Sequence, residues 1–114
     1  MDAIAAQEIS RNIIAQLGGN QFFVMTGSKV KHYAIAVNSG NVTLTLTLTR
    51  NAVGANHLAI TLNSMDTYDV QFLAVSKKSV KVVTENNGIY CDQLRGLFES
   101  TTGLRTSLTH IYSI

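Results

Sequence analysis

The chain has 114 residues, the size of one domain, and 46% of them are hydrophobic, an ordinary share for a globular protein. Its formal net charge is only +2 and it contains no proline, which excludes a strongly basic composition and a proline-rich linker. We therefore expect a single domain over residues 1–114, with a core that needs no disulfide to hold it.

The first stretch, residues 3–17, has the spacing of an amphipathic helix. Ile9, Ile13 and Leu17 recur every four residues and place apolar side chains on one stripe. Gly18 and Gly19 follow, and glycine readily takes the left-handed conformation that ends a helix. The sequence predicts a helix over 3–17.

Residues 21–85 change to a strand-like pattern, in which short apolar or alternating runs are separated by Asn, Ser and Gly. The most regular run is VTLTLTLT at 42–49, where leucines face one side and threonines the other. Asn86-Asn87-Gly88 is expected to end the strand region. Four to six strands are predicted, from the runs 21–26, 33–37, 42–49, 57–63, 67–75 and 79–85.

Helical spacing returns at residues 90–101. Tyr90, Leu94, Leu97 and Phe98 fit one stripe, and Gly103 follows as a stop signal. The sequence leaves two alternatives open for the tail, residues 104–114, which either adds a short strand or packs along the surface.

The order of these elements defines the expected fold class. Every connection between predicted strands is short, and parallel strands would need long crossovers, so the sheet must be mostly antiparallel. One apolar face of the sheet needs a cover, which the terminal helices can supply. We predict a two-layer α+β fold, with a meander of four to six strands flanked by an N-terminal and a C-terminal helix.

No pattern of catalytic or metal-binding residues is recognisable. His32, His57 and His110 show no metal-site spacing, either with each other or with Cys91, the only cysteine. Cys91 lies near the start of the second predicted helix, but its neighbours match no nucleophile signature. We expect no enzyme activity, no cofactor and no metal. The acidic start, the single cysteine and the lack of a long apolar run predict a cytoplasmic protein without a membrane partner.

Positive charge gathers in the middle of the chain. From residue 29 to residue 81 there are six bases and only two acids, and the bases lie in or beside predicted loops, where they suit contacts with phosphate. The alternative is a solvated set of cations that keeps a β-rich protein soluble. The predicted nucleic-acid-binding residues, for single-stranded or double-stranded DNA, are Lys29, Lys31, Arg50, Lys77, Lys78 and Lys81.

Three segments of the sequence resemble a widespread group of small proteins encoded by bacteriophages and related mobile elements. They are QLGGNQFFVMTGSK (16–29), NHLAITLNSMDTYDVQF (56–72) and GIYCDQLRGLFESTTGLRTSL (88–108). The resemblance implies a protein of the host-cell cytoplasm and assigns no role to any residue. The order of four antiparallel strands and a helix is also similar to that of the PC4-like and Whirly single-stranded-DNA binders, in architecture alone.

Two functions follow as expectations. The first is a small, phage-type, nucleic-acid-associated binding protein, non-catalytic and homodimeric. The second is a protein-interaction module that binds and inhibits a host defence factor, through a sheet whose edge can pair with a partner.

Overall fold

The structure is a computed structural model that describes the backbone of residues 3–35 and 41–106, and the side chains of residues 7–30 and 41–106. In this part of the chain three helices accompany five strands. The helices are α1 (Ala3–Leu17), α2 (Asn20–Thr26) and α3 (Leu94–Thr102). The strands are β1 (Lys29–Ile35), β2 (Val42–Thr47), β3 (His57–Leu62), β4 (Tyr68–Val75) and β5 (Val80–Ile89).

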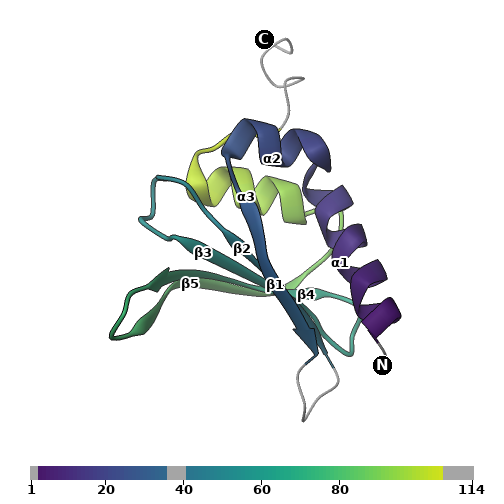
Figure 1. Cartoon of the computed structure of the whole chain (residues 1–114). Helices are drawn as coiled ribbons and strands as arrows, with labels where there is room; N and C mark the ends of the chain where they lie inside the picture. The colour runs from purple at the N-terminus through teal and green to yellow at the C-terminus, as the bar shows by residue number, and fades with distance from the viewer. Residues whose placement is uncertain (1–2, 36–40, 107–114) are drawn as a thin grey trace.

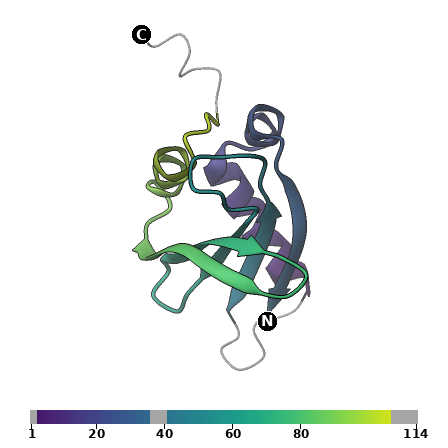
Figure 2. The same cartoon turned by 90° about the vertical axis from the view of Figure 1, so that its left-hand side faces the viewer.

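The five strands form one antiparallel meander in the order β1-β2-β3-β4-β5. All three helices lie on the same side of this sheet, and the other side is open (Figure 1). The turned view shows the twist of the strands (Figure 2). In the strand order, β1 and β5 form the two edges of the sheet. The predicted α+β fold, with an antiparallel meander and helices at both ends of the chain, is confirmed.

The core lies between the sheet and the helices. Leu44 and Leu46 of β2 are fully buried beneath α1, whose Ile13 and Leu17 are also fully buried. The threonines of β2 face the open side, where the Thr43 and Thr61 hydroxyls hydrogen-bond across the strands at 2.7 Å. The alternation of leucine and threonine therefore assigned both faces of β2 correctly.

The strand predicted at residues 21–26 is wrong, because this stretch is helix α2. Phe22 and Thr26, four residues apart, are both buried, whereas Val24 between them is 73% exposed, as one face of a helix requires. The Phe22 ring packs edge-to-face on Phe98 of α3 with ring centroids 5.0 Å apart. This tertiary contact outweighs the strand preference of a run rich in Phe, Val and Thr.

Other element boundaries also differ from the sequence prediction. The first strand begins at Lys29 instead of residue 33, and residues 36–40 lie outside the described part of the chain. The last strand does not end at Glu85 but continues to Ile89, because Asn87 and Gly88 are absorbed as a bulge in which Gly88 has φ 68°. The final helix begins at Leu94 instead of Tyr90, because Tyr90 and Gln93 close a turn first, with the Gln93 amide donating to the Tyr90 carbonyl at 2.9 Å.

Little of the predicted tail is described. Thr106 is fully buried, and its amide and hydroxyl both hydrogen-bond the Glu99 carboxylate of α3, at 2.9 and 3.0 Å. Residues 104–106 therefore pack along α3 and do not form a strand, in agreement with the second of the two alternatives for the tail. Residues 107–114 lie outside the described part of the chain.

Gly27 provides a first testable prediction. It ends α2 with φ 71°, and a Cβ added there would lie 2.8 Å from the Thr49 methyl group, whereas Gly54 has a similar φ of 73° but open space around it. We expect Gly27→Ala to lower the free energy of unfolding by more than the ~1–2 kcal/mol that left-handed backbone alone costs, and Gly54→Ala by about that amount. Urea denaturation of both variants measures the difference, and equal costs would contradict the close contact.

Candidate nucleic-acid interface

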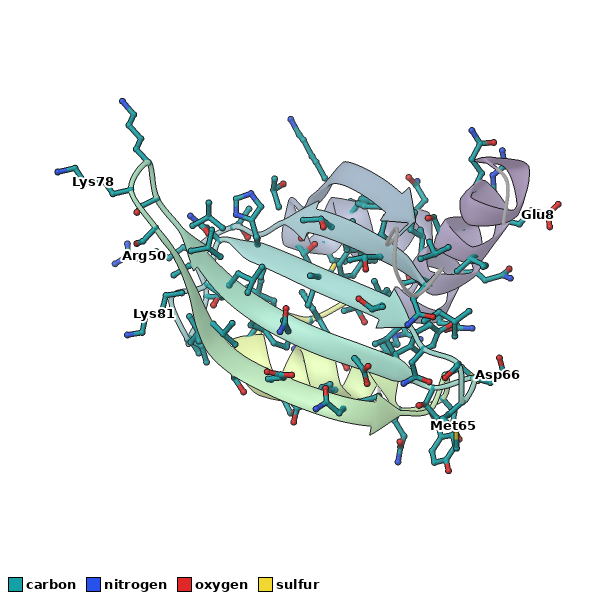
Figure 3. All side chains as sticks on the ribbon, turned by 90° about the horizontal axis from the view of Figure 1, so that it is seen from below. Glu8, Arg50, Met65, Asp66, Lys78 and Lys81 are labelled. Atoms are coloured by element: carbon teal, nitrogen blue, oxygen red, sulfur yellow. The ribbon has the colours of Figure 1, made fainter. Side chains whose placement is uncertain are left out.

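The structure brings five of the six predicted bases to one end of the sheet. Successive hairpins of a meander turn at alternate ends, so the start of β1, the β2–β3 loop and the β4–β5 turn lie together. Figure 3 shows Arg50, Lys78 and Lys81 at this end and Met65 and Asp66 at the opposite one. We call it the basic end, formed by Lys29, Arg50, Lys77, Lys78 and Lys81.

These five side chains are exposed to solvent, and within the described part of the chain none of them forms an ion pair. The backbone of Lys31 also lies near this end, two residues into β1, but its side chain is outside the described residues. Lys81 pairs with Ala74 near the β4–β5 turn. The basic end thus presents unneutralised positive charge across the sheet.

The width of this end follows from the strand spacing. Neighbouring strands lie about 4.8 Å apart, and Lys29 and the β4–β5 turn lie at the two sides of the five-stranded sheet, so the cations are spread over its width. Such a row of cations can contact several consecutive phosphates, since each strand of a duplex carries one phosphate for about every 3.4 Å of helix axis.

Asn51 braces the loop that carries Arg50. Its side-chain amide donates to the carbonyls of Thr49 and Ala55 at 2.8 and 2.6 Å, and its side-chain carbonyl accepts the Val53 amide. The Thr49 hydroxyl donates to the Thr26 carbonyl at 2.6 Å, which ties this loop to the end of α2. The loop is therefore held by side chains on both sides of Arg50.

Asn56 joins the β2–β3 loop to the end of β4. Its side chain donates to the Val75 carbonyl and accepts the Val75 amide, both at 2.8 Å, just before the turn with Lys77 and Lys78. Within that turn the Ser76 hydroxyl accepts the Ser79 amide at 3.2 Å. The two loops that carry most of the bases are thus fixed relative to one another.

The rest of the open face has a different character. A shallow polar hollow of about 430 Å³ lies on it towards the end opposite the bases, lined by Thr61, Asp69, Gln71, Glu85 and Asn87. Asp69 is fixed there by hydrogen bonds from the Asn63 side-chain amide at 3.1 Å and from the Gly88 amide at 3.3 Å. The carboxylates of Asp69 and Glu85 in this hollow would repel phosphate. This part of the open face is therefore unsuited to binding nucleic acid.

A second hollow, mostly apolar, opens beside the basic end. It has a volume of about 460 Å³ and lies between α2 and the start of β1. Val24 and Val30 in its wall are 73% and 45% exposed, and Phe23 is half-buried. Its lining residues are Phe23, Val24, Gly27, Ser28, Lys29 and Val30.

The remaining reactive groups do not gather into a site. Cys91 is exposed in the turn directly before α3, three residues ahead of the first helical residue, so it precedes the helix and is not part of its first turn. Burial raises the pKa of Tyr68, with smaller contributions from Cys91 and Asp66, and a hydrogen bond with Gln16 opposes the rise. Among the described residues no three His, Cys, Asp or Glu side chains are placed to hold a metal ion. None of the described helices has the length and apolar character needed to cross a membrane.

The sequence did not predict the bracing roles of Asn51 and Asn56, nor the apolar hollow between α2 and β1. The two asparagines flank the loop RNAVGAN, where asparagine commonly bonds to nearby backbone, so their bracing role could have been inferred. The hollow could not, because it depends on residues 21–26 being helical.

Comparison with family models, with curated proteins and with solved structures found no match to this chain.

Proposed function

We propose that the protein is a small, non-catalytic nucleic-acid-binding protein of the phage type that its sequence resembles, and that it contacts the phosphate backbone through the basic end. One observation carries the proposal: bases from β1, the β2–β3 loop, the β4–β5 turn and β5 gather at one end of the sheet, exposed and without ion pairs among the described residues. Bases far apart in sequence that form one surface suit phosphate contacts.

The separation of charge adds support. In the sheet, the acids Asp66 and Asp69 lie towards the opposite end, and Glu85 pairs with Gln71 away from the turn. A polyanion approaching the molecule is therefore attracted to one end and repelled from the part of the open face that carries these acids. The bracing by Asn51 and Asn56 supports the proposal as well, since fixed loops lose less entropy on binding.

Fluorescence anisotropy with labelled single-stranded and double-stranded DNA tests the proposal. We expect binding at about 50 mM salt, and with five or six phosphate contacts an affinity on the order of a hundredfold to a thousandfold lower at about 200 mM. Absence of binding at the lower salt concentration, or binding insensitive to salt, would refute the proposal.

The second candidate, a module that binds and inhibits a host protein, is favoured by a different observation. Val80 and Val82 of β5 are 64% and 45% exposed and pair with Val75 and Leu73 of β4, so four apolar side chains share the open face beside the β4–β5 turn. Exposed apolar groups of this kind mark interaction surfaces. A tagged pull-down from host lysate tests this function, and recovery of the protein alone would count against it.

We also propose a homodimer, whose interface is restricted by the shape of the two outer strands. The two outer strands both deviate from regular pairing, β1 between Val30 and His32, and β5 between Val82 and Thr84. Bulges and lysines on outer strands oppose the addition of a further strand. A dimer would therefore join through side chains such as Val80 and Val82, and sedimentation velocity measures whether it forms.

A further inference from the structure

The apolar hollow beside Lys29 has no role in phosphate binding, yet it adjoins the surface proposed for it. It is a shallow hollow of about 460 Å³ that is widely open to solvent. Val24 and Val30 in its wall are 73% and 45% exposed, so two neighbouring apolar side chains face water at this hollow. An occupant that covers this surface would remove apolar area from water.

The chemistry of the lining defines the occupant. Phe23, Val24 and Val30 supply apolar and aromatic surface, and the exposed Lys29 supplies a cation at the same hollow. The matching ligand has an apolar ring and an anion joined to it by a short link. An unpaired nucleotide has this form, with a base to pack on Phe23 and a phosphate to contact Lys29.

The hollow is also firmly built. The Phe23 ring packs edge-to-face on the buried Phe22, with ring centroids 5.3 Å apart. On the other side, the Lys29 amide donates to the Thr47 hydroxyl at 3.2 Å, which fixes the start of β1 against β2. The loop between α2 and β1 is held by Thr26, whose hydroxyl accepts the Ser28 amide at 3.2 Å. The walls are therefore in place before any ligand arrives.

We propose that this hollow receives an unpaired base of a single-stranded nucleic acid, whose backbone continues from Lys29 along the basic end. This inference rests on the proposed function and narrows it, because a base within a duplex is stacked on its neighbours and cannot enter the hollow. Single strands are therefore bound in preference to duplexes.

The test compares an oligothymidylate with an abasic oligonucleotide of the same length, at one salt concentration. Both oligonucleotides carry the same phosphates, but only the oligothymidylate has bases that can fill the hollow. We expect the oligothymidylate to bind about tenfold more tightly, the effect of stacking one base on an aromatic side chain. Phe23→Leu, which keeps an apolar side chain of similar size, and Val24→Asn should both reduce this ratio towards one without weakening binding of the abasic oligonucleotide.

Met65→Asn is the matched control, because Met65 is 80% exposed at the opposite end of the sheet and should leave the ratio unchanged. Equal affinity for the two oligonucleotides would overturn the base site and leave phosphate binding intact. Binding of neither would overturn both. A change from dimer to monomer in Val24→Asn, with the ratio unchanged, would assign the hollow to a second copy of the chain and also overturn the base site.

Discussion

Replacing Lys77 and Lys78 together with glutamine is expected to weaken single-stranded DNA binding by about tenfold or more at 50 mM salt. Both side chains are exposed in the β4–β5 turn, and within the described part of the chain neither has an ion-pair partner that could compensate for the loss. Each lysine that releases a counterion contributes about 0.7 to the slope of log affinity against log salt for a single strand. The slope should therefore fall by about 1.4, as measured by anisotropy over a salt series.

Arg11→Gln is the control for this prediction, compared with Lys78→Gln so that each variant loses one positive charge. Arg11 is exposed on α1, which packs on β1 and β2, whereas Lys78 lies in the turn between β4 and β5. We expect Lys78→Gln to change the slope and Arg11→Gln to leave it nearly unaltered. Equal changes of the slope in the two variants would mean that the protein attracts DNA by its net charge alone. They would contradict the proposal that phosphate binds at the basic end.

Phe98→Ala is expected to produce the largest loss of stability, about 3–5 kcal/mol in the free energy of unfolding. The Phe98 ring is buried in α3 and lies between Phe22 of α2, with centroids 5.0 Å apart, and Phe72 of β4, at 6.5 Å. Its removal leaves a cavity where two helices meet the sheet. A loss of this size is a large part of the 5–15 kcal/mol typical of a whole domain.

Urea denaturation followed by circular dichroism measures this loss. Val24→Ala, at an exposed position of the neighbouring helix, should change stability by no more than about 0.5 kcal/mol. If Phe98→Ala does not fold, Phe98→Leu should still lose a measurable part of the stability, because the ring contacts with Phe22 and Phe72 disappear. A cost below about 1 kcal/mol for Phe98→Ala would contradict the packing described here.

Local patterns were sufficient to predict much of the fold. The alternation in β2 and the fourfold spacing in α1 arise within one element, so the burial of Leu44, Leu46, Ile13 and Leu17 could be read from the sequence. The meander followed from the short connections. Helix α2 could not be predicted from strand preference, because its conformation depends on the contact between Phe22 and Phe98, which are distant in the sequence.

The basic end was only partly predictable. The local excess of positive charge indicates the six bases, and the antiparallel order of the strands implies that their loops share one end of the sheet. The sequence could not place the start of β1 correctly, since the continuous apolar run YAIAV predicts a strand that begins at residue 33. Such a strand would leave Lys29 in a loop, whereas its backbone pairs with Thr47. The apolar hollow depends on both of these corrections.

Nucleic acid is expected to bind at the basic end and not on the open face. An NMR titration with a single-stranded oligonucleotide, following the backbone amides, tests this most directly. The largest chemical-shift changes are expected to cluster at Lys29, Arg50, Lys77 and Lys78. Changes centred instead on Thr61, Asp69 and Gln71, which line the polar hollow of the open face, would contradict this expectation.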